Sequence, residues 1–452
     1  MEKKRVYIRT FGCQMNAYDT GKMKALLASD GYEATEDMAE ADLVIVNTCS
    51  VREKPEHKLH SFLGDARRIK RERKKARKRP MTLAVSGCVA QQEGQKLLDR
   101  YRDLDLVFGP DAIPSITRLV EGAKEKQVLD TTFLDAADYV FASELDPGAS
   151  DSIGAFVTIQ KGCDNKCTFC IVPATRGIEV SRPSTQILDE VRRLVGQGVQ
   201  EITLIGQNVN SYGLKVDGER TFAQLLYGVA DIEGVERIRY TTSHPRDMGA
   251  DVVQAYRDLP KLTSYLHLPV QSGSDQILKR MKRFYTRQRF LDLVDRLRDA
   301  RPDLVLSTDF IVGFPGETDA DFEDTMTLLD AVRFQSSYSF KYSQRPDTPA
   351  LRLIDRGAEV PAAIVSARLT RLQARQRVIG EAENRRLEGT VLDVLVEGPS
   401  RHDVGVICGR SGTFKTINFP GSLELVGQTV PVVVTRGFAN SLRGEMVAQL
   451  AQ

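Results

Sequence analysis

The 452-residue sequence lacks the features of a membrane or exported protein. Its uninterrupted apolar runs are only a few residues long, whereas a helix that crosses a bilayer needs about 20 apolar residues. The first residues, MEKKRVYIRTFGC, are partly basic but contain no apolar stretch of the kind that a secretory signal requires. We therefore expect a cytoplasmic protein with no membrane partner.

The sequence also has almost no net charge, since 63 Lys and Arg against 61 Asp and Glu leave +2. A total of this size does not indicate a nucleic-acid-binding protein, so any basic surface must be local. A composition of 41% hydrophobic and 27% charged residues excludes collagen, low-complexity disorder and a coiled coil. At roughly 150 residues per domain, the length predicts about three domains.

The sequence contains seven cysteines, which cannot all be paired in disulfides, and we do not expect the chain to be exported. Disulfides are rare in the reducing cytosol, so metal binding or catalysis is the better interpretation. Three cysteines are dispersed, three are clustered, and the last one is interpreted as buried filler. They are Cys13, Cys49 and Cys88; Cys163, Cys167 and Cys170; and Cys408.

Residues 1–135 predict alternating strands and helices, and hence a parallel α/β sheet. Apolar strands are expected over Arg5–Thr10, Ala41–Asn47 and Met81–Ser86, and one dispersed cysteine follows each within three residues. The carboxyl ends of parallel strands share one edge of a sheet, where ligands gather. We expect the three cysteines on that edge, with three buried structural cysteines as the alternative.

A dense basic run, RRIKRERKKARKR, lies between the second and third of these strands. Such a block creates a positive field suited to a polyanion, but charge runs are usually solvated surface, and both interpretations stay open. The candidate RNA-binding side chains are Arg67, Arg68, Lys70, Arg71, Arg73, Lys74, Lys75, Arg77, Lys78 and Arg79.

After a Gly- and Ser-containing linker at 136–154, strand and helix alternate six times. Six βα units form either a doubly wound sheet or an incomplete barrel, with the chemistry in the loops after the strands. The expected strands are Ala155–Gln160, Glu201–Ile205, Arg237–Thr242, Ser264–Pro269, Leu304–Ile311 and Ser336–Lys341. A polar helix at Pro361–Leu387 then leads to a small all-β module at Glu388–Leu450, interpreted as a barrel.

The most specific motif is the loop KGCDNKCTFC, residues 161–170, directly after the first of these six strands. Its spacing is Cys-x3-Cys-x2-Cys, and no fourth Cys or His lies nearby to complete a tetrahedral zinc site. On a 4Fe–4S cluster, three thiolates would leave one iron open to another ligand. The incomplete set indicates a site kept open for chemistry, with zinc and a remote fourth ligand as the alternative.

This loop, with Phe169 before its last cysteine, resembles the signature of radical S-adenosylmethionine (SAM) enzymes. The resemblance implies a partial barrel of six βα units and a 4Fe–4S cluster on Cys163, Cys167 and Cys170. It also implies that SAM chelates the open iron and is cleaved to a 5′-deoxyadenosyl radical.

The N-terminal cysteines narrow the resemblance to the methylthiotransferases, and three motifs resemble their tRNA branch: FGCQMN at 11–16, NTCSVREK at 47–54 and IGQNVNSY at 205–212. The C-terminal module resembles the RNA-binding TRAM domain. The resemblance covers essentially the whole chain, and implies a second 4Fe–4S cluster on Cys13, Cys49 and Cys88 for sulfur delivery. It further implies two SAM molecules per turnover and transfer of a methylthio group to carbon 2 of N6-isopentenyladenosine beside the tRNA anticodon.

The loops after the strands supply the expected SAM contacts, although two amides replace the acid of the superfamily's Gly-Gly-Glu element. These residues are Phe169, Gly206, Gln207, Asn208, Gln271, Ser272, Gly273, Ser274, Asp309, Gly313 and Phe314. Arg176 and Arg182 are candidates for contact with tRNA or SAM, with a structural ion pair as an equal alternative. No catalytic residue beyond the cluster ligands is predicted.

The expected division is a methylthiotransferase N-terminal domain at 1–147, a radical SAM domain at 148–380 and a TRAM-like domain at 381–452. tRNA is the expected partner of a monomeric chain, and the sequence does not identify the electron donor or the source of sulfur. Methylthiolation of threonylcarbamoyladenosine in tRNA, or of a ribosomal-protein aspartate, is the alternative within the family. A non-catalytic iron–sulfur protein that binds RNA or senses redox state is the alternative of another class.

The two cysteine triads predict a specific metal content. Protein reconstituted without oxygen should contain about eight iron and about eight acid-labile sulfide per chain, because each cluster contributes four of each. Colorimetric iron and sulfide assays measure both. A value of about four would leave the N-terminal triad without a cluster and contradict the methylthiotransferase interpretation.

Overall fold

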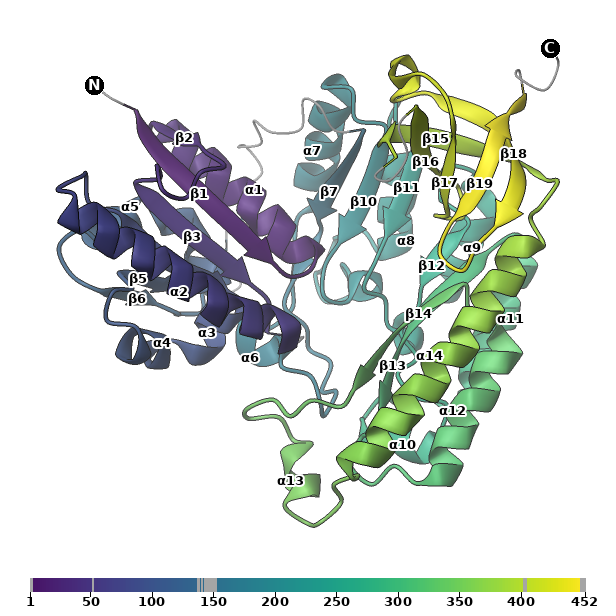
Figure 1. Ribbon diagram of the computed structural model, residues 1–452. Coiled ribbons are helices and arrows are strands. Elements are labelled where there is room, and N and C mark those ends of the chain that lie inside the picture. Colours follow the sequence, from purple (N-terminus) through teal and green to yellow (C-terminus); the bar gives the residue numbers. More distant parts are fainter. Residues whose placement is uncertain are drawn as a thin grey trace.

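The computed structural model describes residues 3–50, 53–135, 139, 141, 153–400 and 405–447. Within these ranges the chain forms three consecutive parts: a parallel α/β sheet, a larger set of βα units and a small β-barrel (Figure 1). The predicted fold class is therefore confirmed. The expected linker at 136–154 lies mostly outside the described residues, and the expected boundary at 380/381 falls within a long helix.

The N-terminal part is a six-stranded sheet in the order β2-β1-β3-β4-β5-β6, and every neighbouring pair is parallel. Strand β3 is buried along its whole length because helices cover both faces, which explains its continuous apolar sequence. The elements are β1 (Lys4–Phe11), α1 (Gln14–Ser29), β2 (Tyr32–Ala34), β3 (Leu43–Thr48), α2 (Glu53–Lys75), β4 (Thr82–Gly87), α3 (Cys88–Glu93), α4 (Gln95–Arg100), β5 (Leu106–Phe108), η1 (Pro110–Ser115), α5 (Ile116–Gly122) and β6 (Val128–Asp130).

The central part contains six parallel strands in sequential order, β7-β10-β11 and β12-β13-β14, and the bridge Ile238–Leu262 joins the two halves. Because each strand neighbours the next one along the chain, the arrangement is a partial barrel and not a doubly wound sheet. The strands are β7 (Gly154–Thr158), β10 (Glu201–Ile205), β11 (Arg237–Tyr240), β12 (Tyr265–His267), β13 (Val305–Val312) and β14 (Ser336–Lys341). The helices that follow them are α7 (Ser184–Gly196), α8 (Phe222–Ala230), α9 (Ala250–Asp258), α10 (Asp275–Arg280), α11 (Arg287–Ala300) and α12 (Asp319–Val332).

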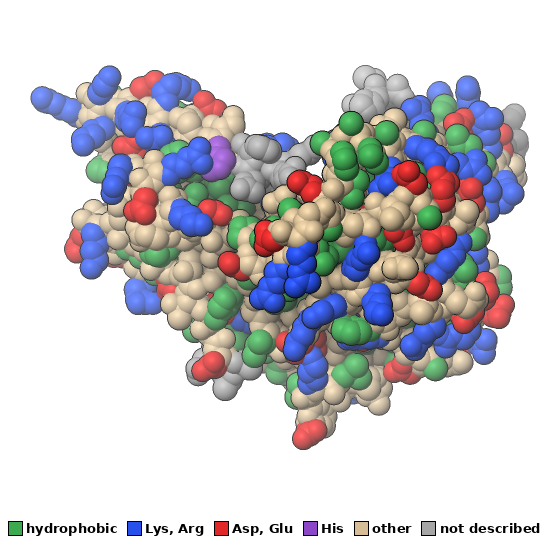
Figure 2. Space-filling view, turned by 90° about the horizontal axis from the view of Figure 1, so that it is seen from below, with side chains coloured by type: hydrophobic (Ala, Val, Ile, Leu, Met, Phe, Trp, Pro, Cys, Tyr) green, Lys and Arg blue, Asp and Glu red, His purple; other side chains and the backbone are tan. Residues whose placement is uncertain are grey.

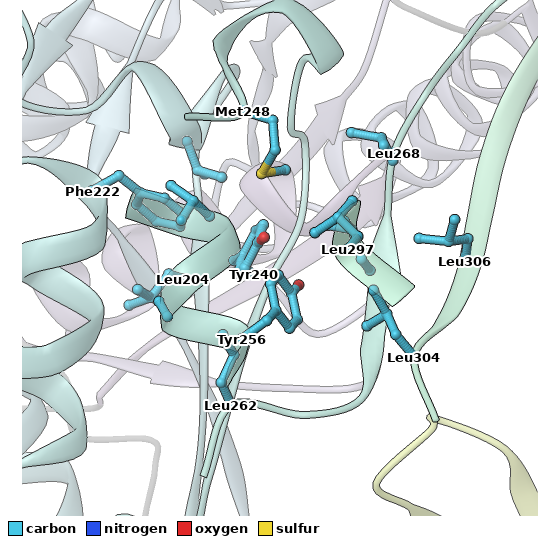
Figure 3. Packing of buried hydrophobic residues seen from close by; sticks show 14 of the residues in the cluster. Leu204, Phe222, Tyr240, Met248, Tyr256, Leu262, Leu268, Leu297, Leu304 and Leu306 are labelled. Atoms are coloured by element: carbon cyan, nitrogen blue, oxygen red, sulfur yellow. The ribbon is translucent and has the colours of Figure 1, made fainter. Parts of the chain in front are cut away.

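One large hydrophobic cluster holds this barrel together. Figure 3 shows Tyr240 beside Tyr256, with Leu204 on one side of the pair and Leu297 on the other. The Tyr240 ring also packs edge-on against Phe222, with ring centroids 4.9 Å apart. Each fully buried side chain of this kind contributes about 1.5–3 kcal/mol, so the packed core keeps the strand ends, and the loops on them, in place.

The C-terminal part is a closed five-stranded barrel in the order β15-β16-β17-β19-β18, reached through helix α14 (Ala362–Arg385). Its strands are β15 (Val391–Pro399), β16 (Val406–Ser411), β17 (Thr416–Pro420), β18 (Thr429–Gly437) and β19 (Leu442–Met446). Strand β11 anchors it: Arg237 donates to the Arg410 carbonyl oxygen at 2.7 Å, and the Arg239 guanidinium lies 4.3 Å from the Phe414 ring centroid. No helix in the described ranges has both the length and the apolarity to cross a membrane.

Close packing at Gly273 predicts a local stability effect. A Cβ atom there would lie 2.4 Å from the Asp324 carbonyl oxygen and 2.6 Å from the Thr325 Cα atom, both in α12. Gly273→Ala should therefore lower the free energy of unfolding by about 1–3 kcal/mol, measured by urea denaturation. The control is Gly196→Ala in α7, where an added Cβ meets nothing within 4 Å and stability should be unchanged or slightly raised. Equal effects of the two substitutions would contradict this.

Candidate functional site

Three neighbouring strand ends bring the dispersed cysteines together. Cys13 follows β1, Cys49 follows β3 and Cys88 follows β4, and these strands are adjacent in the sheet. The Cys49 side chain forms hydrogen bonds with those of Cys13 and Cys88. The structure thus places the first triad on one edge, as the sequence predicts.

Small residues before the cysteines make this convergence sterically feasible. Gly87 has a φ of +89°, and a Cβ there would lie 2.4 Å from Asn47 Oδ1. Asn47 donates to the Asn16 carbonyl oxygen at 2.8 Å, and Asn16 Oδ1 accepts from the Cys13 amide at 3.3 Å. A buried amide network therefore supports the triad from inside the sheet.

Two of the three thiols in the first triad have a lowered pKa. The hydrogen bond with Cys49 lowers the pKa of Cys88 to about 5, against the effect of burial and with help from Arg176. A hydrogen bond with Cys49 also lowers the pKa of Cys13 to about 7. The hydrogen bonds with Cys13 and Cys88 in turn raise the pKa of Cys49. Thiolates, not thiols, bind metals, so two of the three sulfurs are partly prepared for this role.

The second triad lies in one loop between β8 (Gln160–Lys161) and α6 (Val172–Arg176). The Cys163 amide donates to the Gly177 carbonyl oxygen at 3.2 Å, which closes the loop on itself. Burial raises the pKa of Cys163 to about 11 and that of Cys170 to about 12. Burial disfavours the thiolate form of both sulfurs, and a bound cation would favour it.

All-sulfur donor sets suit iron–sulfur clusters or zinc. Across the described ranges, no group of three or more His, Cys, Asp and Glu side chains is close enough together to hold a metal ion. The two cysteine triads remain the expected ligands of a cluster, in which each thiolate binds a different iron.

Unpaired polar atoms at the barrel loops fit a polar ligand such as SAM. Gln207 Oε1, Asn208 Oδ1 and Gln160 Oε1 are buried with no hydrogen-bond partner. Leaving such an atom unsatisfied costs about 1–3 kcal/mol, so a bound group that donates to it is favoured. Asp309, on β13, has one carboxylate oxygen 3.5 Å from His267 Nε2.

Several other expected SAM-contacting residues have structural contacts. Ser274 Oγ caps α10 by accepting from the Ile277 amide, and the Gly273 amide donates to Thr325 Oγ1 at 2.9 Å. Phe314 is fully buried, and its ring centroid lies 5.3 Å from that of Tyr342. These contacts, together with those of neighbouring residues, hold the loops in their conformation. The expected contacts of this set with SAM, including Phe169, Gly206, Gln271, Ser272 and Gly313, stay predictions.

The two candidate arginines after the loop are both buried. Arg182 has no exposed surface, forms an ion pair with Glu190 and donates to the Thr158 carbonyl oxygen at 3.2 Å. Arg176 donates to Asp19 at 2.7 Å and to Cys88 Sγ at 3.4 Å. The structure therefore favours the structural ion pair over direct contact with tRNA for both side chains.

The basic run divides into two sets along α2 and the turn after it. Arg67, Lys70, Arg71, Arg73 and Arg79 pair with acidic side chains of the same domain, and Arg73 is buried. The others are exposed, namely Arg68, Lys74, Lys75, Arg77 and Lys78, and Arg68 pairs with Glu72 of its own helix. Figure 2 shows Lys and Arg side chains, mixed with Asp and Glu, on the N-terminal part at the left of the view.

Sequence reasoning missed four residues that contact or support the triads: Asn16, Asp19, Asn47 and Arg283. A usable signal existed for two of them, because Asn16 and Asp19 lie three residues apart and face inward from α1. Polar residues on the buried face of a helix usually have a partner to satisfy. Arg283 had no comparable signal, since it follows α10 and meets Cys167 only through the fold.

Solved structures of low sequence identity share the fold. The radical SAM methyltransferase TsrM from Kitasatospora setae, with cobalamin and a [4Fe-4S] cluster bound, superposes with a TM-score of 0.56. It is 15% identical, and the match covers 77% of this chain and 74% of that chain. The cobalamin-dependent SAM radical enzyme OxsB, with aqua-cobalamin and SAM bound, gives a TM-score of 0.53 at 12% identity over 84% of this chain and 58% of that one.

Three family models match consecutive parts of the sequence. The model described as "Uncharacterized protein family UPF0004" matches residues 5–109, the Radical SAM superfamily model residues 157–329 and the TRAM domain model residues 385–447. The order agrees with the three structural parts.

Full-length relatives are more specific. A tRNA-2-methylthio-N(6)-dimethylallyladenosine synthase from Geobacter metallireducens is 47% identical over 98% of both chains. A protein of the same name from Xanthomonas axonopodis pv. citri is 46% identical over 99% of this chain and 92% of its own. The chain therefore belongs to the family of tRNA-2-methylthio-N(6)-dimethylallyladenosine synthases.

Proposed function

We propose that this protein is a radical SAM enzyme that transfers a methylthio group to carbon 2 of N6-isopentenyladenosine in tRNA. The observation that carries the proposal is the pair of incomplete cysteine triads in one chain whose full-length relatives bear that name. An unactivated ring carbon–hydrogen bond offers no leaving group, so radical chemistry suits it. Enzymatic relatives set aside the non-catalytic alternative.

Each triad has a distinct role in the proposal. Cys163, Cys167 and Cys170 would hold the cluster that binds SAM, and Cys13, Cys49 and Cys88 would hold a second one. When bound, these groups supply reductive cleavage of SAM and sulfur for transfer. The chain's own contribution is placement: α6, directly after Cys170, packs against α3, which begins at Cys88.

The remaining residues would bind and orient the substrates. The unpaired Gln207 and Asn208 oxygens would accept hydrogen bonds from SAM. The C-terminal barrel and the exposed cations of α2 would hold the tRNA backbone. We assign these tasks to three domains with the boundaries expected from the sequence: 1–147, 148–380 and 381–452.

The division between the triads is testable by substitution. Replacing Cys163, Cys167 or Cys170 with Ala should abolish release of 5′-deoxyadenosine from SAM. Replacing Cys13, Cys49 or Cys88 should preserve measurable release but stop formation of methylthiolated tRNA. Anaerobic assays with chromatographic detection of both products measure this. Equal loss of 5′-deoxyadenosine from the two sets would contradict separate roles.

The exposed cations of the basic run predict a change in salt dependence. Lys74→Gln, Lys75→Gln, Arg77→Gln and Lys78→Gln combined should weaken tRNA binding and flatten the plot of log Kd against log salt, since fewer counterions are released. Binding is measured by fluorescence anisotropy at several salt concentrations. The matched control replaces four other exposed cations of the same domain with Gln: Lys96, Arg118, Lys124 and Lys126. If both variants have the wild-type slope, the basic run is solvated surface.

A further inference from the structure

In each triad, one cysteine sulfur accepts a hydrogen bond from a buried arginine, and the arginine differs between the triads. Arg176, at the end of α6, donates through Nε to Cys88 Sγ at 3.4 Å. Arg283, after α10, donates through Nη1 to Cys167 Sγ at 3.5 Å. Both side chains are about 95% buried, since only 5% of each residue is exposed. Arg176 was a candidate for contact with tRNA or SAM and not with a cysteine, Arg283 was not singled out, and the function proposed above assigns no role to either.

Arg176 crosses from one structural part to another. It belongs to the segment that follows the second triad, yet it binds Cys88 of the first triad and Asp19 of α1. Its charge is largely balanced by the Asp19 carboxylate 2.7 Å away. The Cys88 sulfur therefore accepts a hydrogen bond from the cation of an ion pair.

Arg283 is held by neutral groups. Its Nη2 donates to the Pro269 carbonyl oxygen at 2.8 Å and its Nε to the Tyr285 hydroxyl at 3.2 Å. No carboxylate in the described part of the chain lies within ion-pair distance of it. Burying a guanidinium this way is costly unless a negative partner is present. The thiolate of Cys167 and the group bound to it would be that partner.

We propose that Arg176 and Arg283 are positioning residues that each make one iron–sulfur cluster easier to reduce, Arg176 through Cys88 and Arg283 through Cys167. The inference rests on the proposed function, because it takes both triads as cluster ligands. One-electron reduction adds a negative charge to a cluster and its thiolates. A fixed cation on one ligand sulfur stabilises that charge, and hydrogen bonds to the sulfurs act in the same direction.

The different surroundings of the two arginines lead to different expectations. Arg283 lacks a balancing carboxylate, so its removal should have the larger effect. For the first triad, Asp19 opposes Arg176, so removing the Asp19 charge should favour reduction while removing the Arg176 charge disfavours it. Opposite signs from two partners of one ion pair distinguish an electrostatic role from simple support of the fold.

The experiment measures the midpoint potential of each cluster alone, in the full-length chain. The first cluster is isolated by replacing Cys163, Cys167 and Cys170 with Ala, and the second by replacing Cys13, Cys49 and Cys88. In each background, Arg176→Gln, Arg176→Lys, Arg283→Gln and Arg283→Lys are introduced, with Asp19→Asn added to the first. Anaerobic redox titration followed by electron paramagnetic resonance reports the reduced fraction, and iron content reports occupancy.

In the first background, Arg176→Gln should make reduction at least tenfold less favourable, a shift of about 59 mV for one electron, and Arg283→Gln should change nothing. Asp19→Asn should shift the potential in the positive direction, and Arg176→Lys should retain most of the wild-type value. In the second background, Arg176→Gln should change nothing. Arg283→Gln should make reduction less favourable, by more than Arg176→Gln does in the first background.

Three results would overturn the inference. The first is an unchanged potential in every variant, and the second is a shift of the same sign from Arg176→Gln and Asp19→Asn. Loss of the cluster from Arg→Lys variants that remain folded, shown by circular dichroism, would be the third, because it would make the arginines structural supports. An unsubstituted chain that holds about four iron would instead refute the proposed cluster on Cys13, Cys49 and Cys88, and the Arg283 titration would still test the role of Arg283 at the other cluster.

Discussion

Parallel strands that end on a common edge are the constraint on which this structure depends. Cys13, Cys49 and Cys88 are far apart in sequence, but three adjacent strands deliver them to one place. The loop with Cys163 follows β8, a short strand after barrel strand β7, and the amides of Gln207 and Asn208 follow barrel strand β10. Strand ends therefore assemble the first triad and position the loop that carries the second, and the apolar cores beneath them keep these positions fixed.

Buried charge marks the contact between the N-terminal sheet and the barrel. Lys161 of β8 pairs with Asp111 of η1, and Arg176 of α6 pairs with Asp19 of α1. Breaking a buried ion pair leaves an uncompensated charge, which commonly costs about 3–5 kcal/mol. These ion pairs therefore fix the position of the barrel relative to the N-terminal sheet, and α6 connects the second triad to the first. A domain contact made only of apolar side chains would tolerate sliding more easily.

The C-terminal barrel is attached by a different kind of contact. The guanidinium groups of Arg239 and Arg410 both pack against Phe414, at 4.3 and 4.1 Å from its ring centroid. Arg237 adds a hydrogen bond to a carbonyl oxygen of the barrel. These groups all lie on or beside β11, so the module that is expected to bind tRNA is fixed directly to the catalytic barrel. Its orientation toward the barrel strands is then set before any RNA arrives.

The sequence by itself determined the elements and the donor chemistry. Strand and helix periodicity are local, so β10 and β14 have the predicted bounds, and Cys-x3-Cys-x2-Cys spacing is readable without a fold. Only the tertiary structure decided which charges meet. Arg176 was a candidate for RNA contact and is instead buried on Cys88, and half of the basic run is paired with Asp42, Asp103 and Asp105. Ion pairs between residues distant in sequence depend on how whole elements pack, and no local pattern records that.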